Sequence, residues 1–187
     1  MLNPIIAWTN TDLIKLGDPA HPEVPSTVIL SDGTGNAVLA DTDSAIVSLA
    51  ITNNFTNGTA ITDAALACFD MKNCTLTVKD TNGGMDEQLV QQKWLRVKAT
   101  SLGESAFTQI GAHLDGSTWV EDAKSIGCGD ATVGVNNISG AINDGTSTGT
   151  GKNNIARFDL QAHPDATANP VTHNFKLRVT YTYGTGA

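Results

Sequence analysis

Apolar and polar residues alternate with a period of two along several short stretches of the chain. The clearest is NFKLRVTYTYG, residues 174–184. Its apolar positions are Phe175, Leu177, Val179, Tyr181 and Tyr183. Successive side chains of a strand point to opposite faces, so the pattern predicts a strand with one buried face. Because burying one such side chain stabilises a fold by about 1.5–3 kcal/mol, we expect this strand to be among the most stabilising parts of the protein.

The same criterion predicts further strands. They are residues 26–33, which end in an Asp-Gly turn, 45–51, 74–80, a long strand over 88–101 that contains Trp94, and 155–163. Residues 106–116 and 117–123 are predicted as a hairpin with its turn at Asp115-Gly116. For residues 60–73 two interpretations stay open: a short amphipathic helix, or a loop followed by a strand.

Two segments lack such alternation. Residues 1–25 contain Pro4, Pro19, Pro22 and Pro25, which is typical of an extended arm. Residues 127–152 are rich in Gly, Asn, Ser and Thr and are predicted as a long loop. Roughly eight to ten short strands with at most one short helix exclude a parallel βαβ architecture. We therefore expect an all-β fold: a single antiparallel β-sandwich or jelly-roll-like domain over 26–187, preceded by the N-terminal arm 1–25.

Composition narrows the function classes. The 187 residues carry a formal net charge of −8, and the eleven Lys and Arg residues are scattered. A nucleic-acid binder needs a basic stripe to displace counterions, so we expect no nucleic-acid partner. No apolar run approaches the ~20 residues of a membrane span, and the start MLNPIIAWTNTD has neither a basic region nor an apolar core of signal-peptide length. We expect a protein made in a cytoplasm, with no membrane partner.

The candidate metal ligands do not form a known pattern. His21, His113, His163 and His173 lack the spacing of a zinc site. Asp41 and Asp43 offer oxygen ligands for calcium, but the rest of an EF-hand loop is missing. The three cysteines, Cys68, Cys74 and Cys128, are expected to be free thiols, with a Cys68–Cys74 bridge as the alternative. We predict no metal and no cofactor.

The sequence also contains no recognisable catalytic motif. The carboxylate pairs Asp86-Glu87 and Glu121-Asp122 are adjacent, and adjacent strand residues point to opposite faces. Gly151-Lys152 is followed by Asn153 where a phosphate-binding loop needs Ser or Thr. The chain has no G-x-S-x-G motif, and no cysteine has a nearby basic partner in the sequence. We therefore expect no enzyme and assign no catalytic, cofactor-binding or metal-binding residue.

Aromatic residues in the strands leave two interpretations. They are Trp8, Trp94, Trp119, Tyr181 and Tyr183. Aromatic side chains in alternating strands usually belong to the core, which is the expectation here. The alternative is a face for carbohydrate binding, since a sandwich with polar loops is a common frame for it.

Three stretches carry a likeness to a known class of proteins: AWTN near the start, KWLRVKATS in the middle and HNFKLRVTYTYG at the end. With the acidic, Gly/Thr/Asn-rich composition and the Pro-rich arm, the chain resembles β-sandwich structural proteins of tailed-bacteriophage virions, of the head-decoration, neck and tail-accessory type. The resemblance implies a non-enzymatic protein located in the virion. It gives no site residue, because such proteins act through surfaces.

Within that class, the first expectation is a capsid decoration (cement) protein that stabilises the phage head lattice. The resemblance implies other virion proteins as partners, namely the major capsid protein or tail proteins, and a symmetric homo-oligomer. The alternatives are a tail, baseplate or neck component and, outside the class, a carbohydrate-binding or adhesin module.

Overall fold

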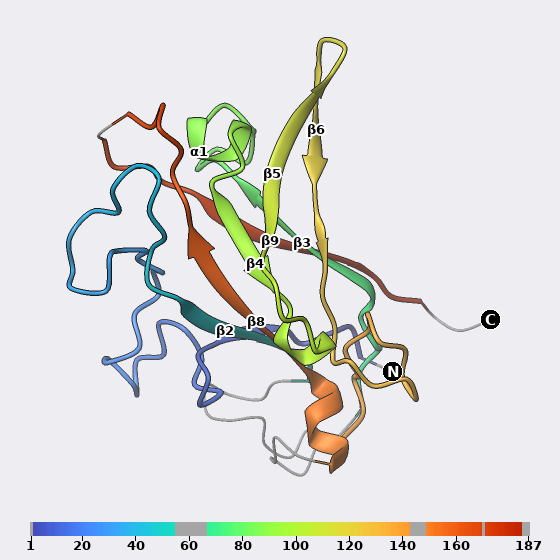
Figure 1. The fold of residues 1–187 in the computed structure, drawn as a ribbon. Helices are drawn as coiled ribbons and strands as arrows, with labels where there is room; N and C mark the ends of the chain where they lie inside the picture. The colour runs from blue at the N-terminus through green and yellow to red at the C-terminus, as the bar shows by residue number, and fades with distance from the viewer. Residues whose placement is uncertain (1, 55–66, 143–148, 170, 185–187) are drawn as a thin grey trace.

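The computed structural model describes residues 2–54, 67–142, 149–169 and 171–184, which form two antiparallel β-sheets (Figure 1). One sheet has six strands in the order β1-β2-β8-β4-β5-β6, and the other has three in the order β7-β3-β9. The strands are β1 Ala7–Thr9, β2 Val47–Thr52, β3 Lys72–Lys79, β4 Leu95–Lys98, β5 Thr108–Asp115, β6 Thr118–Asp122, β7 Lys124–Ser125, β8 Ile155–Ala162 and β9 Lys176–Thr182. The expected all-β, sandwich-like fold is confirmed.

Alternation along the strands builds one core between the sheets. The three-stranded sheet contributes Cys74, Leu76 and Val78 from β3, all fully buried. The six-stranded sheet faces them with β4, whose Leu95 and Val97 are buried, and with β8, whose Phe158 and Leu160 are buried. In each strand these buried apolar residues are two apart, as the period-two pattern predicts.

The two long sides of the sandwich differ. On one side β6 runs almost directly into β7, with only Ala123 between them, so a single stretch of chain passes from one sheet to the other. On the other side the sheets end in β1 and β9, and no strand among the described residues joins these edges. The sandwich is therefore closed along β6–β7 and open between β1 and β9.

Two predicted strands are corrected by the structure. Residues 26–33 form no strand, and the Asp32 side chain instead accepts hydrogen bonds from the amides of Thr34 and Asn36 (2.8 and 3.0 Å). Donation by the amide and hydroxyl of Thr34 lowers the pKa of Asp32 to about 2. The sequence SDGTGN thus favours a local turn over pairing with another strand, because the Asp side chain offers the backbone alternative hydrogen bonds.

The predicted long strand 88–101 divides into three elements. The short helix α1 (Gln88–Gln91) buries Leu89 and Val90, β4 follows, and the 3-10 turn η1 covers Thr100–Leu102. Lys93 has a positive φ of 55°, and this change of backbone direction separates the helix from the strand that follows. Helix α1 lies so close to β5 that a Cβ on Gly111 would be 2.3 Å from the Val90 carbonyl oxygen, so this strand position requires glycine.

The N-terminal segment 1–25, expected as an arm, packs on its own domain over the described residues. β1 pairs with β2, and Ala7 and Leu13 form a small buried cluster with Ala50 and Ile155. Half of the 60–73 segment, residues 60–66, lies outside the described residues, and its described half leads into β3 without a helix. The predicted loop 127–152 lies partly outside them too, but its Ile138 is fully buried and its end enters the 3-10 helix η2 (Gly149–Asn154).

One buried side chain, missed by the sequence analysis, joins several of these irregular segments. Asn53, at the end of β2, accepts hydrogen bonds from the amides of Ile5 (3.1 Å) and Asn54 (2.8 Å). Its side-chain nitrogen donates to the carbonyl oxygens of Phe69 (3.0 Å) and Ile138 (3.3 Å). Asn53 is fully buried, so these contacts hold segments without regular structure to the sheet.

Candidate functional site

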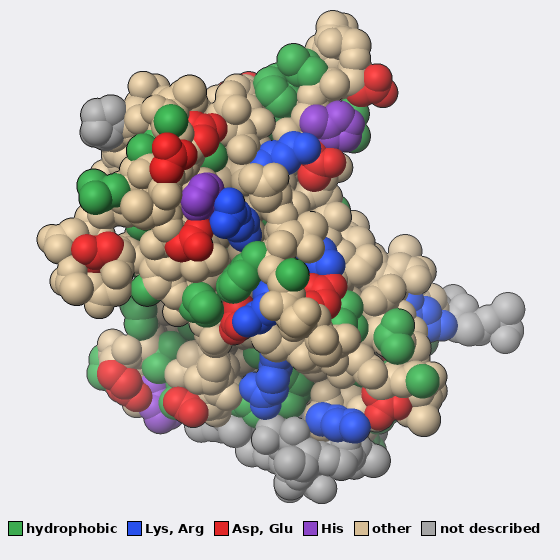
Figure 2. All heavy atoms as spheres, in the orientation of Figure 1, with side chains coloured by type: hydrophobic (Ala, Val, Ile, Leu, Met, Phe, Trp, Pro, Cys, Tyr) green, Lys and Arg blue, Asp and Glu red, His purple; other side chains and the backbone are tan. Residues whose placement is uncertain are grey.

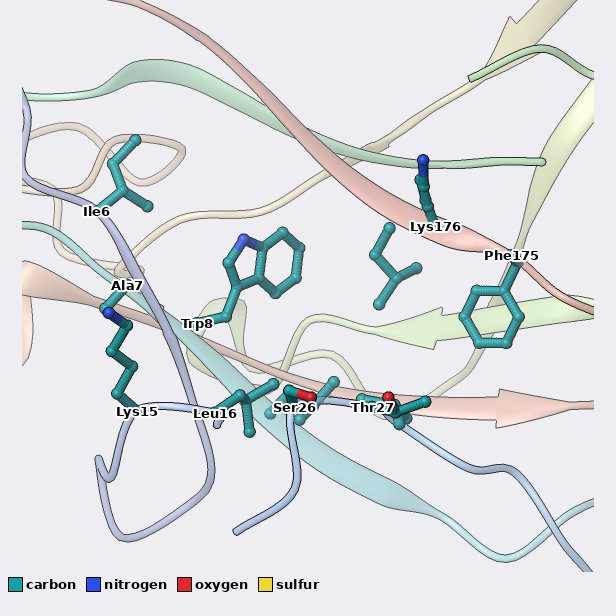
Figure 3. A pocket seen from close by; sticks show the side chains of 12 residues that line it. Ile6, Ala7, Trp8, Lys15, Leu16, Ser26, Thr27, Phe175 and Lys176 are labelled. Carbon is teal, nitrogen blue, oxygen red and sulfur yellow. The ribbon is translucent and has the colours of Figure 1, made fainter. Parts of the chain in front are cut away.

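The open side of the sandwich holds a groove of about 470 Å³ between the sheet edges (Figure 3). The apolar part of its lining comes from both sheets and from the loop after the N-terminal segment: Ile6, Trp8, Leu16, Val28, Leu49, Phe175 and Leu177. A volume of this size and a mostly apolar lining are typical of ligand or peptide sites. Trp8 stands in the groove with its ring edge-to-face against buried Phe158, at a centroid distance of 6.3 Å.

The N-terminal end of strand β9 borders this groove. Three consecutive residues, Phe175, Lys176 and Leu177, line the groove, although neighbouring side chains of a strand point to opposite faces. Within the described part of the chain, β9 makes backbone hydrogen bonds to β3 alone. The backbone groups along the other edge of β9 are therefore available to a partner.

The inward side chains of β9 are less buried than the sequence pattern predicts. Phe175, Leu177, Val179 and Tyr181 alternate with exposed residues as expected, but all four are only half-buried. The reason is that β9 is an end strand beside the open groove, so its apolar face lacks a covering strand. The face was predicted correctly and its degree of burial was not.

The charged groups of the groove are all cationic. Its lining contains Lys15 and Lys176 and no acidic residue. Within the described residues neither lysine forms an ion pair. This contrasts with the net charge of −8 of the whole chain, and it makes the groove locally complementary to anionic groups.

A second candidate surface is the end of the β5–β6 hairpin. β5 pairs with β4 only through Thr108–Ile110, whereas its pairing with β6 continues from Gly111 to Asp115. The rest of the hairpin therefore extends beyond the sheet as a two-stranded ribbon (Figure 1). Leu114 and Val120 near its end are 56% and 38% exposed, and Figure 2 shows apolar side chains gathered there.

The hairpin was predicted correctly, but its turn lies one residue later than the predicted Asp115-Gly116. Asp115 pairs with Thr118, so the two-residue turn consists of Gly116 and Ser117, and Gly116 has a φ of 62° that favours glycine. Lys93 holds the base of the ribbon through an ion pair with Asp122 at 2.8 Å. The turn and this base fix the direction in which the ribbon extends.

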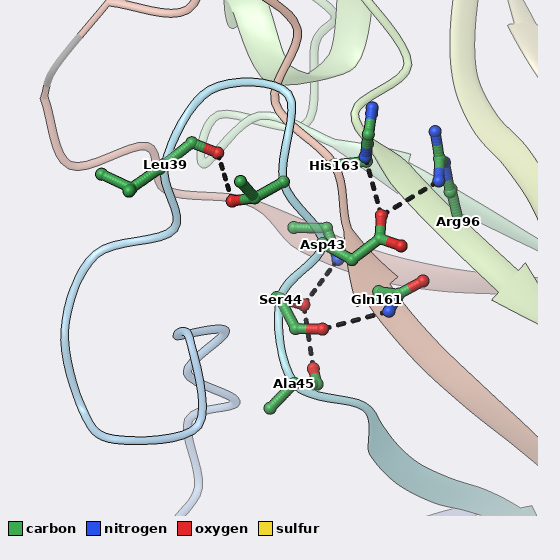
Figure 4. Close-up of polar contacts among 9 residues, drawn as sticks. Leu39, Asp43, Ser44, Ala45, Arg96, Gln161 and His163 are labelled. Atoms are coloured by element: carbon green, nitrogen blue, oxygen red, sulfur yellow. Dashed lines mark hydrogen bonds and ion pairs between the residues drawn. The ribbon is translucent and has the colours of Figure 1, made fainter.

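Asp41 and Asp43, the aspartates considered as calcium ligands, have different surroundings. Asp43 accepts hydrogen bonds from His163 Nδ1 (2.7 Å) and from Arg96 (3.1 Å), so its carboxylate already has two partners (Figure 4). Asp41 is exposed and lies in a turn, where its own φ is 57°. Over the described ranges, no group of three or more His, Cys, Asp or Glu residues is arranged to hold a metal ion.

The neighbouring Ser44 does not act as a nucleophile beside His163. Its hydroxyl donates to the Ala45 carbonyl oxygen (2.8 Å) and accepts from the Ala162 amide (2.8 Å), and the residue is buried. The Gln161 side chain donates to the Ser44 carbonyl oxygen (3.0 Å). These contacts, drawn in Figure 4, anchor the chain before β2 on β8.

The carboxylates of Glu121 and Asp122 on β6 separate as predicted, whereas Asp86 and Glu87 precede α1 and lie in no strand. Glu121 contacts Lys79 (2.5 Å) and Arg178 (3.3 Å), while Asp122 contacts Lys93 and His113 (3.0 Å). In the other pair, the Asp86 amide donates to Asp80 (3.1 Å) and Glu87 lies 3.4 Å from His173. Each carboxylate of the β6 pair thus stabilises a different neighbour, and the two do not face one cleft.

All three cysteines are free and buried. Burial raises the pKa of each thiol, and that of Cys74 reaches about 12. A thiol with so high a pKa carries almost no thiolate at neutral pH, which is the reactive form.

Every histidine contacts a carboxylate: His21 with Glu23, His113 with Asp122, His163 with Asp43, and His173 with Glu87. His113 lies in strand β5, and His173, in the loop before β9, packs edge-to-face on Trp94 with a centroid distance of 5.0 Å.

The five aromatic residues divide between core and surface. Trp94 is 2% exposed and donates its indole N–H to Asp165 (3.0 Å), so it belongs to the core. Trp8, Trp119 and Tyr181 are half-buried, and Tyr183 is the most exposed, at 48%. Tyr183 lies near Phe69 and Tyr181, with ring centroids 6.2 and 6.0 Å away.

Comparison of the chain with models of protein families, with curated proteins and with solved structures finds no match. In the described residues, no helix has the length and apolar character needed to cross a bilayer.

Proposed function

We propose that this protein is a non-catalytic assembly component that acts through its surfaces, and that within this class it is a capsid decoration protein of a tailed-bacteriophage head. The observation that supports the proposal best is the ribbon of the β5–β6 hairpin. A two-stranded ribbon is at best marginally stable alone in water. This one also exposes Leu114 and Val120, which favours contact with another protein.

A decoration protein adds buried interface to a lattice that has already formed, and the molecule has suitable groups. Besides the hairpin, it exposes Ile29 and Leu39 (76% and 70%) on the loop that precedes β2. Hairpin and loop lie at different ends of the view in Figure 1, so one molecule has separate contact points for two neighbours. A few apolar contacts within a polar, hydrogen-bonding surface are typical of interfaces between proteins that also exist separately.

The direct test is co-sedimentation with purified capsids of the virus that encodes the chain, prepared without this protein. We expect the wild type to pellet with capsids and the double variant Leu114→Glu/Val120→Glu to remain in the supernatant. Val135→Glu/Val171→Glu is the matched control, with the same charge change at exposed apolar residues outside both the hairpin and the loop before β2. A wild type that stays in the supernatant and is a strict monomer by light scattering would refute the proposal. Binding to tails instead of capsids would favour the neck, tail or baseplate alternative.

Carbohydrate binding is the second candidate, and the cluster of Phe69, Tyr181 and Tyr183 favours it. Tyr183 offers an exposed ring beside a pocket of about 370 Å³ whose lining includes Asp70 and Lys72. Aromatic faces next to polar groups suit sugar rings. A glycan array tests this idea: binding that is lost in Tyr183→Ala supports it, and an array without binding removes it.

A further inference from the structure

We propose that the groove on the open side binds an extended, partly acidic segment of another protein, which adds as a strand to the free edge of β9. This inference does not depend on the capsid proposal, because it concerns a different surface. The carrying observation is that an unpaired strand edge, an apolar groove and two unpaired lysines meet at one place.

The backbone supplies the first part of the argument. β9 is the end strand of its sheet, and over the described residues its backbone is hydrogen-bonded only to β3. The groove meets the start of β9, since Lys176 and Leu177 line it together with Phe175, which directly precedes the strand. A strand placed there would extend the three-stranded sheet and satisfy the backbone groups of β9, which is the mode called β-augmentation.

The side chains supply the second part. Alternate residues of an added strand point to one face. In this position that face meets the apolar wall formed by Trp8, Leu49 and Leu177, and it would cover the half-buried side chains of β9. The partner segment therefore needs apolar residues at every second position.

Charge determines the kind of partner. Lys15 and Lys176 are exposed at the groove, and the lining has no acidic residue. Figure 3 places the two lysines at different ends of the groove, one on the N-terminal segment and one on β9. A segment with acidic residues toward both ends would match them. A second copy of β9 fits poorly at the groove, because antiparallel pairing centred on Leu177, which lines it, would place Lys176 of each copy opposite Arg178 of the other.

The probe for a test is a synthetic nonapeptide, acetylated and amidated, with valine at every second position, serine or threonine between the valines, and glutamate at both ends. Its binding to the full chain is followed by calorimetry and by the fluorescence of Trp8, with Trp8→Phe as the reference for the other two tryptophans. We expect saturable binding. A peptide with lysine in place of both glutamates should bind at least about threefold more weakly.

Three variants of the protein locate the site. Thr27→Trp places a large side chain in the groove from an exposed loop position and should abolish binding, whereas Ala166→Trp, at an exposed turn elsewhere, should not. Lys15→Glu/Lys176→Glu should weaken binding about tenfold. Lys72→Glu serves as the charge control, because Lys72 is exposed and pairs with the opposite end of β9. Circular dichroism confirms that each variant is folded.

Backbone pairing is tested with a peptide N-methylated at alternate residues, which removes donors along one edge and should not bind. Equal binding of the methylated peptide would overturn strand addition. Failure of every peptide to bind the folded wild type, or tighter binding of oleate in the same groove, would overturn the proposal of a polypeptide partner. A concentration-dependent dimer that is abolished by Thr27→Trp would show that a second copy occupies the groove and would overturn it too.

Discussion

The two long sides of this sandwich contain similar residues in different states. Toward the closed side, Leu95 and Val97 of β4 and Ile110 of β5 are fully buried in the core between the sheets. Along the open side, Leu177 and Val179 of β9 have the same chemistry but stay half-buried beside a groove. The difference teaches that an alternating strand contributes stability in proportion to what covers it, and that an uncovered apolar strand edge is a surface for binding.

Two leucines on the two sides provide the largest expected contrast. Leu95→Ala should reduce the free energy of unfolding by about 2–5 kcal/mol, because it leaves a cavity in a close-packed core. Leu177→Ala should cost roughly half as much or less, because part of its side chain is already in contact with solvent. Urea unfolding at pH 7 measures both. Equal losses would mean that the groove does not weaken the packing of β9.

Asn53, which follows β2, should give the next largest effect on stability. Asn53→Ala removes the partner of two buried amides and two carbonyl oxygens and should cost about 1–3 kcal/mol. The exposed Asn169→Ala is the control and should change stability little. The same unfolding experiment applies. An Asn53→Ala variant as stable as the control would show that the irregular segments are held by packing alone.

Acid should weaken the turn between β3 and α1. Asp80 accepts hydrogen bonds from the amides of Asp86, Gly84 and Asn82, and these lower its pKa. A carboxyl group with a lowered pKa in the folded state stabilises the protein above its unfolded pKa, and this contribution disappears as the pH falls through the folded value. The stability advantage of the wild type over Asp80→Asn should therefore be constant from pH 7 to 5 and shrink toward pH 3. An advantage that does not change with pH would contradict this assignment.

The smallest effect concerns the thiols. Because burial raises the pKa of Cys74 to about 12, Ellman's reagent should not react with it in the native protein at pH 8. All three cysteines should react once the protein is unfolded. Ser117→Cys, at the exposed hairpin turn, is the control that should react at once. Rapid reaction of Cys74 in the native state would mean that β3 opens far more easily than its burial implies.

The sequence predicted the fold class and the strands whose alternation is regular. Residues 45–51, 74–80, the 106–123 hairpin, 155–163 and 174–184 all correspond to strands. The prediction of a strand was wrong at 26–33, because the Asp32 side chain accepts hydrogen bonds from nearby backbone amides. It was wrong for the first part of 88–101, because Leu89 and Val90 fit a helical turn as well as a strand.

The groove could not be predicted from the sequence. It depends on which strands lie at the ends of the two sheets, and Trp8, Val28 and Leu177 are far apart along the chain. Lys15 and Lys176 look in the sequence like ordinary solvated charges, and only their position beside the groove distinguishes them. The same holds for Asn53, whose partners Ile5, Phe69 and Ile138 come from three separate segments.

The central claim is that the open edge of β9 is a binding surface and that the closed side stabilises the fold. Native-state hydrogen exchange, with and without the nonapeptide, tests it most directly. We expect the amides of β8 and β4 to be strongly protected in both conditions, and those of β9 to exchange faster in the free protein and to slow when the peptide is added. If β9 is as protected as β8 in the free protein and does not respond to the peptide, the claim is wrong.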